Sequence, residues 1–397
     1  MSVLVSLRGS SHDHHGNATI LNFSPAILLA RGLAYIILAI ATVISNCIVL
    51  YVFHKHRSLL RIPSNLFILN LAIIDLLNGL FRDTFNGVSW LNNGWTFGEP
   101  LCRFNGFMQT ICYVVTIFTL LATGICRYLV IVHSYGKVIT RKVVLIIIGC
   151  IWIYSILDSL MPIFGWNRYI FQPLEFSCLP DWLSVSGASY VMFALIADTI
   201  IPSILIGLCY IVIYIVIARN AKRMANRFHI EHSNNVIPSI GNSVDNSVAN
   251  TPENDRNRQA RAKWSNGNTL GRKEVKITRA MFSVYVIFLA CYLPYALTIF
   301  IIAPAGGNVS HNIIFMVGYL VNVNSAINPF FYGVIYRQFR KAYIELFCCC
   351  GLSAVSVKFP TSRSRHRHLL NSTPIIDRKN RVDVLRDGMT DASTSNL

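Results

Sequence analysis

Several ionisable side chains lie inside long apolar segments of this sequence. Asp75, Arg127, Asp158 and Asp198 each stand within a run of mostly apolar residues. Burying a charge costs free energy unless it is paired or hydrogen-bonded, so such residues are candidates for function. Asp158 and Asp198 could meet a cationic group of a ligand; the alternative is that water or hydroxyl groups satisfy both. An enzyme is not indicated, because the sequence holds no metal-spaced His/Cys cluster, no Gly-rich phosphate loop and no nucleophile elbow.

Seven apolar runs are long enough to place these residues in a membrane. A spanning helix needs about 20 mostly apolar residues, and candidates occur at 32–54, 63–88, 101–132, 142–165, 185–218, 275–303 and 311–336. Of the 397 residues, 53% are hydrophobic and only 13% are charged, about half the charged share of soluble domains. The runs lack the period-two alternation of barrel strands. The sequence therefore predicts an all-α membrane protein, a seven-transmembrane helix bundle with a short amphipathic eighth helix, Arg337 to Phe347.

Lys and Arg residues are divided unequally between the two sides of this predicted bundle. The whole chain has a formal net charge of +17. Its N-terminal side carries only Arg8, Arg31, Arg82, Arg103 and Arg168, and the other Lys and Arg residues fall on the opposite side. Because inner loops carry the excess of Lys and Arg, we expect a plasma-membrane protein with an extracellular N-terminus. The basic inner face would meet anionic lipid and a signalling partner. A nucleic-acid binder is not expected, since it would be polar as well as basic.

The chain is expected to divide into three parts. Residues 1–30 form an extracellular N-terminal tail, 31–346 contain the bundle, and 347–397 form a cytoplasmic tail. The long third cytoplasmic loop, 219–274, and the C-terminal tail are rich in Ser, Asn and Arg without apolar periodicity, so both are expected to be disordered.

Candidate modification sites agree with this orientation. Acceptors for N-glycosylation fall on the predicted outer side at Asn17, Asn22 and Asn308. Three cysteines follow the amphipathic stretch on the inner side, Cys348, Cys349 and Cys350. This context favours S-palmitoylation; a run of free cytosolic thiols is the alternative.

Polar and proline-containing motifs follow one another in a set order along the seven runs. They are Asn46, Leu71-Ala-Ile-Ile-Asp75, Cys126-Arg127-Tyr128, Trp152, Pro202 with Tyr210, Cys291-Tyr-Leu-Pro294 and Asn328-Pro-Phe-Phe-Tyr332, with Phe339 beyond. This set resembles the rhodopsin-like (class A) G-protein-coupled receptors over residues 30–348, and local strings around Cys102, Gly165 and Tyr332 are similar to opsins and melatonin receptors. The resemblance implies a receptor that passes an extracellular small-molecule signal to heterotrimeric G proteins by helix rearrangement. Arrestin and a receptor kinase would use the Ser/Thr-bearing tail.

The resemblance to opsins does not extend to covalent retinal chemistry. Retinal is held in opsins as a Schiff base on a lysine of the seventh helix, and the matching position here is Asn322. The predicted seventh helix, 311–336, contains no lysine. The positions that match opsin counter-ions, Asn105 and Gln172, are not acidic, and Gln109 replaces the carboxylate that pairs with protonated amines in amine receptors. We therefore expect no covalently bound retinal and no cofactor of that kind.

The resemblance also implies a disulfide, an ion site and a ligand pocket. Cys102 and Cys178 would form a disulfide between the third helix and the loop before the fifth. Oxygen ligands for an allosteric sodium ion would converge mid-bundle from Asp75, Thr116, Asn324 and Asn328; a hydrogen-bonded polar core without an ion is the alternative. The ligand pocket, in the outer half of the bundle, would take Arg82, Asp83, Asn105, Gln109, Tyr113, Asp198, Tyr292, Tyr295, Tyr319 and Asn322.

A further group of residues would couple the receptor to its G protein: Arg127, Tyr128, Tyr210, Glu274, Pro294, Asn328, Pro329 and Tyr332. Arg127 would pair with Glu274 when inactive and reach the G protein when active. The acid that usually precedes this arginine is Cys126 here, so half of the restraint is absent, and we predict raised basal signalling. Other contacts that hold the helix end are the alternative. Tyr292 stands where the family usually has Trp.

Two other functions fit part of the sequence. Intramembrane acids also mark ion paths, so a channel or transporter is one alternative; it would leave Arg127, Glu274 and the Asn-Pro motif of the seventh helix unexplained. The other alternative is a receptor-fold protein with high basal activity, or one that acts as a dimer partner without an agonist of its own.

Overall fold

Seven helices that are long and apolar enough to cross a membrane make up the fold. The computed structural model describes residues 23–133, 135–182, 187–234, 275, 277–298, 310–335 and 337–349. These residues belong to one compact unit of the chain, Met1–Cys350. The predicted seven-helix membrane fold is confirmed.

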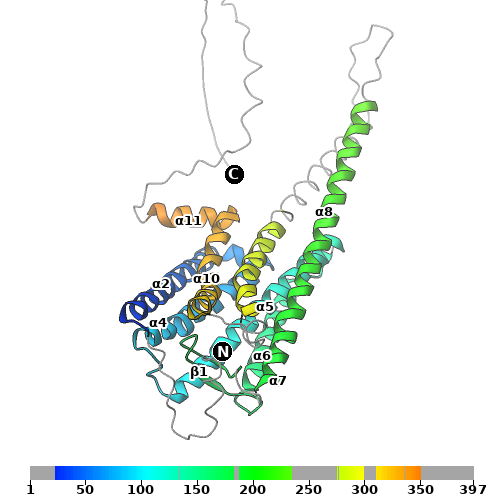
Figure 1. Cartoon of the computed structure of the whole chain (residues 1–397). Coiled ribbons are helices and arrows are strands. Elements are labelled where there is room, and N and C mark those ends of the chain that lie inside the picture. The colour runs from blue at the N-terminus through cyan, green and yellow to red at the C-terminus, as the bar shows by residue number, and fades with distance from the viewer. Residues whose placement is uncertain are drawn as a thin grey trace, which may run out of the picture. The chain divides into compact units, whose positions relative to one another are not determined.

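The helices follow the order of the apolar runs (Figure 1). The first, third, fourth and seventh spans are α2 (Pro25–Lys55), α5 (Glu99–Val132), α6 (Arg141–Leu160) and α10 (His311–Ile335). Two spans are interrupted by π-helical turns: the second consists of α3 (Asn65–Leu77), η2 (Asn78–Asp83) and α4 (Thr84–Leu91), and the fifth of α7 (Ala188–Phe193), η4 (Ala194–Ile200) and α8 (Ile201–Asn234). The sixth span is Ile277–Leu297. Short 3-10 turns, η1 (Arg57–Arg61) and η3 (Tyr135–Lys137), follow the first and third spans.

The fourth helix is shorter than the sequence predicted. It ends at Leu160 rather than at 165. Pro162 lacks a backbone N–H for a further helical turn, and Gly165 adopts φ +101°, which glycine tolerates better than other residues. The chain then leaves the helix toward a strand that the sequence analysis did not predict.

A two-stranded hairpin lies between the fourth and fifth spans. Strands β1 (Tyr169–Gln172) and β2 (Ser177–Pro180) pair antiparallel, with Phe171 opposite Cys178. A disulfide joins Cys178 to Cys102 at the start of α5, as the resemblance implied. An isolated hairpin is marginally stable, so this bond fixes the hairpin over one end of the bundle, called the hairpin end below.

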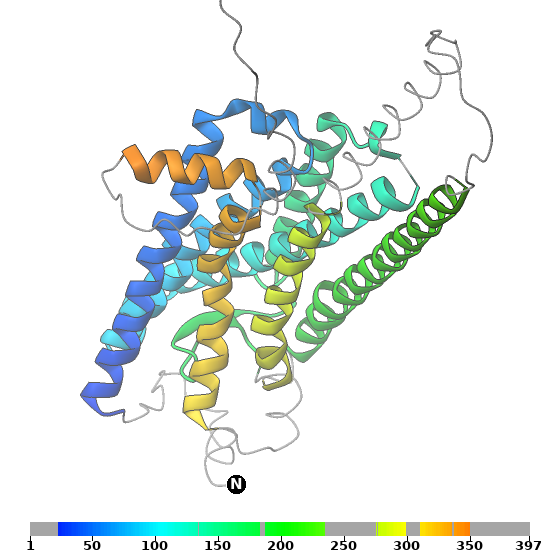
Figure 2. The same ribbon diagram turned by 90° about the horizontal axis from the view of Figure 1, so that it is seen from above.

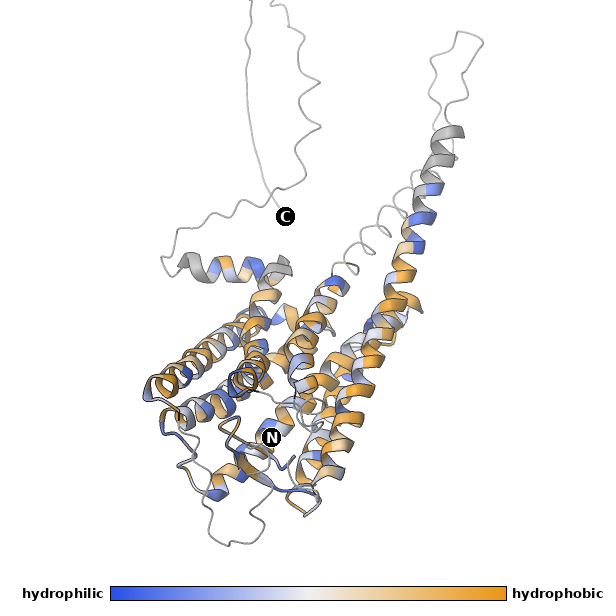
Figure 3. Cartoon of the chain, in the orientation of Figure 1, coloured by the Kyte–Doolittle hydropathy of each residue, from blue (hydrophilic) through white to orange (hydrophobic). Residues whose placement is uncertain are grey.

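Large apolar side chains cover the outward faces of the spans. They are exposed along α2, α6 and α8 at positions that include Ile37, Ile146, Ile153, Ile204 and Tyr214, and Figure 3 shows the apolar colouring of these helices. Exposed apolar surface of this extent suits contact with lipid, where helices pack through small and polar residues on their inner faces.

The opposite end of the bundle is closed by an apolar cluster and by α11 (Arg337–Cys349), the predicted amphipathic helix. Figure 2 shows α11 running across the end of α10. Its Phe339 is fully buried, with ring centroids 5.3 Å from Phe53 and 6.3 Å from Tyr332, whereas Arg340 and Lys341 are exposed. One apolar and one basic face are therefore present, as the sequence indicated.

Candidate functional site

Arg82 and Asp83 are adjacent charged residues at the end of the π-helical turn η2, and their side chains lie in different surroundings. Asp83 is buried toward α2, where its Oδ2 accepts a hydrogen bond of 3.4 Å from Thr42 Oγ1. A Cβ on Gly79 would lie 3.1 Å from Thr42 Cγ2, so glycine permits this close approach of the two helices. Arg82 instead lines a cavity at the hairpin end. The two side chains thus have different neighbours, and of the two only Arg82 lines the cavity.

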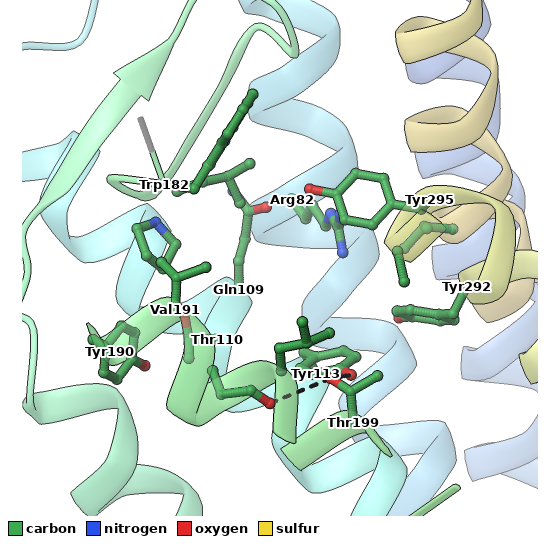
Figure 4. Close-up of a pocket in the computed structure, with 16 residues that line it drawn as sticks. Arg82, Gln109, Thr110, Tyr113, Trp182, Tyr190, Val191, Thr199, Tyr292 and Tyr295 are labelled. Atoms are coloured by element: carbon green, nitrogen blue, oxygen red, sulfur yellow. Dashed lines mark hydrogen bonds between the residues drawn. The ribbon is translucent and has the colours of Figure 1, made fainter. Parts of the chain in front are cut away.

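This cavity has a volume of about 160 Å³ and is bounded by five of the seven spans and by β2 with the residues that follow it. Five residues predicted for the ligand pocket line it: Arg82, Gln109, Tyr113, Tyr292 and Tyr295. Figure 4 shows their side chains around the cavity. The sequence analysis missed the remaining wall, Thr110, Leu179, Pro180, Trp182, Tyr190, Val191, Ala194, Leu195, Thr199, Ala296 and Val321. The walls are mainly apolar, as in most sites for small molecules.

Arg82 is the charged side chain of this cavity. It is only 9% exposed, and it makes no hydrogen bond and no ion pair within the part of the chain that the structure describes. The other polar lining groups are neutral; the hydroxyls of Tyr113 and Thr199, for example, are hydrogen-bonded to each other at 2.6 Å (Figure 4). A guanidinium with its five donors therefore lies at the wall of an otherwise uncharged space.

A buried carboxylate, Glu175, lies close to Arg82 and was not predicted. Both residues line a second, small cavity together with Tyr35 and Asn322. The two carboxylate oxygens of Glu175 accept hydrogen bonds of 3.0 Å from the Tyr295 hydroxyl. Burial raises the pKa of Glu175 to about 7, against the opposing effects of the Tyr295 hydrogen bond and the Arg82 charge. Its place shortly before Cys178, the cysteine expected to be tied to the third helix, was the sequence signal that could have identified it.

Gln109 and Asn105 hold the hairpin in place. The Gln109 amide donates to Ser177 Oγ at 3.0 Å and to the Cys178 carbonyl at 3.3 Å. Asn105 accepts from Gln109 and donates to the Phe81 carbonyl at 2.6 Å. Gln109 therefore both lines the cavity and fixes its cover, whereas Asn105 does not line it.

Other residues predicted for the pocket lie outside the cavity. Asp198 accepts a 2.6 Å hydrogen bond from the Tyr154 hydroxyl, and Asp158 accepts one of 3.4 Å from Tyr190. Hydroxyl groups thus contact both acids, in agreement with the alternative considered above. Tyr319 donates to the Ala34 carbonyl at 3.3 Å, and Asn322 borders the small second cavity rather than the main one.

The residues expected at a mid-bundle ion site are partly brought together. Asn328 Nδ2 donates to Asp75 Oδ2 at 2.9 Å. Asp75 Oδ1, Asn324 Oδ1 and Asn328 Oδ1 are buried and have no hydrogen-bond partner among the described residues. Thr116 donates to the Cys112 carbonyl of its own helix at 2.7 Å. Asp75 and Asn328 are in contact, and their unpartnered Oδ1 atoms would suit a small cation or a water molecule at this place.

At the end of the bundle that carries α11, Arg127 is buried on α5. Its neighbour Cys126 packs in an apolar cluster that includes Phe67 and Val144. Tyr128 is hydrogen-bonded to His133 at 3.1 Å. Pro202 is the second residue of α8, directly after η4, and Pro329 lies within α10. The predicted partner of Arg127, Glu274, lies outside the described residues.

The apolar cluster at this end contains two of the tyrosines predicted for G-protein coupling. Tyr210 and Tyr332 are both buried in it, and the Tyr210 ring stacks on Tyr285 at 5.9 Å. Of the predicted modification sites, Asn17, Asn22, Asn308 and Cys350 lie outside the described residues, and Cys348 and Cys349 end α11.

Comparison with known proteins agrees with this geometry. Residues 45–332 match the family described as 7 transmembrane receptor (rhodopsin family). The chain is 31% identical over 335 residues to "Rhodopsin, GQ-coupled" of Mizuhopecten yessoensis, covering 80% of this chain and 60% of that protein. It is 29% identical to mouse Opsin-3, covering 82% of this chain and 72% of that protein, and 28% identical to human melanopsin, covering 86% and 67%.

The fold is also similar to that of a solved receptor. A crystal structure of squid rhodopsin superposes with a TM-score of 0.65 at 24% identity, covering 83% of this chain and 89% of that one. The family match covers most of the chain and overlaps all seven of the spans described above. The chain therefore belongs to the rhodopsin family of seven-transmembrane receptors, which are signalling proteins and not enzymes.

Proposed function

We propose that this protein is a plasma-membrane receptor, with an extracellular N-terminus, that transmits a small-molecule signal to heterotrimeric G proteins by helix rearrangement. The observation that carries the proposal is the cavity at the hairpin end, which is bounded by helices from five spans. A ligand there would contact spans that also pack together in the apolar cluster around Tyr210, and one of them, α5, carries Arg127. Two similar scallop proteins are named as GQ-coupled and G0-coupled rhodopsins, which supports a G protein as the partner.

Aromatic contacts connect the cavity with the opposite end of the bundle. Tyr292 lines the cavity and stacks on Phe288 with ring centroids 4.3 Å apart. Phe288 is fully buried in the cluster that contains Tyr210 and Tyr332. A ligand that displaces the Tyr292 ring would therefore disturb the packing of these tyrosines. In this proposal Tyr292 takes the position at which the family usually has Trp.

The ligand is held without a covalent bond. The helix that bears the Schiff-base lysine in opsins has Asn322 at the matching position and no lysine between His311 and Ile335. Arg82, the cation of the cavity, remains protonated and is not a nucleophile under ordinary conditions. We include no cofactor in the proposal.

Further parts of the proposal concern ions, lipids and partners. Asp75, Asn324 and Asn328 would hold a sodium ion that favours the inactive packing. We also propose glycans on the N-terminal tail and palmitoyl groups on the cysteines at the end of α11. The C-terminal tail would contact arrestin and a receptor kinase. Asparagine-linked glycans, detected by a glycosidase-dependent change in mass, would place the N-terminus outside the cell.

Expression in cells with energy-transfer sensors for each G-protein class, in darkness and under illumination, tests receptor activity. We expect basal output that Arg127→Ala abolishes while surface expression is retained. Arg141→Ala is the matched control, because Arg141 is an exposed cation at the start of α6. Unchanged output from Arg127→Ala together with an ionic current would support a channel instead.

A further inference from the structure

Arg82 carries a buried positive charge, and no carboxylate among the described residues forms an ion pair with it. Arg82 is 9% exposed, and none of its nitrogen atoms has a hydrogen-bond or ion-pair partner among the residues described. A buried charge left unpaired is strongly destabilising unless something compensates it. Arg82 lines the main cavity at the hairpin end as well as the small second cavity. An occupant of the main cavity is thus in a position to supply the missing acceptor.

We propose that the cavity binds a small aromatic carboxylate, whose carboxylate group pairs with the Arg82 guanidinium and whose ring packs among the tyrosines. This inference rests on the proposed receptor function and names the class of its ligand. Arginine binds a carboxylate through two parallel N–H···O hydrogen bonds, which gives both affinity and orientation. Lysine would provide the charge without the planar pair of donors, and an amide side chain would not provide the charge.

The size and lining of the cavity favour one aromatic ring. Its volume is about 160 Å³, and an engineered apolar cavity of about 150 Å³ binds benzene. Its walls include Tyr113 and Tyr292, whose ring centroids are 5.4 Å apart, together with Trp182 and Tyr295. Aromatic side chains at this spacing offer offset-stacked and edge-to-face contacts to a further ring.

The acids of the bundle argue against a cationic ligand. Asp158 and Asp198 do not line the cavity, and tyrosine hydroxyls donate to both. Within the described part of the cavity wall, Arg82 is the charged residue. A protonated amine would therefore meet a positive charge and no carboxylate.

Glu175 is the internal competitor of such a ligand. It borders the small cavity that Arg82 also lines, and its carboxylate is oriented by the Tyr295 hydroxyl. The negative charge of Glu175 attracts the guanidinium and repels a carboxylate ligand. Removing this charge should strengthen ligand binding, whereas removing the charge of Arg82 should abolish it. A purely structural role for the pair predicts that both changes weaken binding.

The experiment measures binding of phenylacetate to the purified full-length receptor in lipid nanodiscs by titration calorimetry. 2-Phenylacetamide and 2-phenylethylamine are matched probes that keep the ring and replace the anion by a neutral or cationic group. We expect phenylacetate to bind and the amide and the amine not to bind. Arg82→Gln should weaken it by about 30-fold or more, Arg82→Lys should weaken it less, and Glu175→Gln should strengthen it by about threefold or more.

Equal binding of the amide and the acid, or a loss of affinity in Glu175→Gln, would overturn the proposal. If Arg82→Gln does not fold, Arg82→Lys and Glu175→Gln still give effects of opposite sign. Failure of the ligand class is distinguishable from failure of the receptor function. Output that depends on Arg127, without phenylacetate binding, rejects only the ligand class, whereas binding of phenylacetate without any G-protein activation rejects only the coupling.

Discussion

Gly106 on α5 supports the hairpin at a point of close contact, which gives a prediction with a defined sign. A Cβ at this position would lie 2.5 Å from Cδ1 and 3.0 Å from Cβ of Tyr169 on β1, whereas carbon atoms in favourable contact are about 3.5–4.0 Å apart. Tyr169 is restrained, because its hydroxyl donates to the Ser159 carbonyl at 2.8 Å and its backbone pairs with Pro180. Gly106→Ala should therefore displace the hairpin.

The expected change in free energy of unfolding follows from two opposing effects. Overpacking of a filled site costs about 1–3 kcal/mol, and replacing a helical glycine by alanine gains about 0.5–1 kcal/mol. The net change for Gly106→Ala is thus a loss of up to about 2.5 kcal/mol. Gly149 on α6 is the matched control, because a Cβ there meets no atom within 4 Å. Gly149→Ala should be neutral or stabilising by up to about 1 kcal/mol.

Reversible unfolding of the purified variants in mixed micelles of lipid and SDS measures these free energies. The Tyr169→Ala background removes the ring that the new methyl group meets, so most of the cost of Gly106→Ala should disappear there. The reasoning fails if Gly106→Ala and Gly149→Ala shift the free energy by the same amount, or if the cost of Gly106→Ala is unchanged without the Tyr169 ring.

Three further predictions follow from single residues. Cys126→Asp should lower basal G-protein output relative to Cys126→Ser, because it restores a carboxylate beside Arg127; equal output from both variants would contradict this. Burial raises the pKa of Glu175 from 4.5 to about 7, so the folded state binds more protons than the unfolded state between these values, and its free energy of unfolding should fall as pH rises from about 4.5 to 7, by on the order of 2 kcal/mol; Glu175→Gln should remove this slope in unfolding measured at several pH values. Replacing potassium by sodium should lower basal output in the native receptor and not in Asp75→Asn, and an identical response in both would reject an ion at Asp75.

Much of the fold could be predicted from the sequence, because a helix in lipid needs a long apolar run and little else. The seven spans were predicted for this reason. The short helix α11 was predicted from its amphipathic pattern, and the disulfide followed from the resemblance. Helix ends were less certain: the run that contains α6 continues past Leu160, and local turn chemistry at Pro162 and Gly165 ends the helix.

The candidate site was only partly predictable, because its walls depend on geometry that apolar periodicity does not encode. Trp182 and Glu175 belong to a connection between spans, and long-range contacts that include the disulfide, the Gln109 hydrogen bonds and the Tyr295 hydrogen bond to Glu175 bring that connection over the bundle. Thr199 lies in a π-helical turn, where residues face directions that ordinary helical spacing does not give. Tyr319 was placed in the pocket by its helix, but its hydroxyl contacts α2 instead.

The π-helical turn η2 makes chain length, and not only residue type, a determinant of what the cavity contains. Deleting one residue from an α-helix rotates everything beyond it by about 100°, which turns buried side chains outward. In a π turn the same deletion restores α-helical winding, so α3 and α4 keep their inward faces while the side chain at the place of Arg82 is exchanged. A one-residue deletion at 78–83 would thus exchange the side chain at the place of Arg82, and with it the charge of the cavity, within the same bundle.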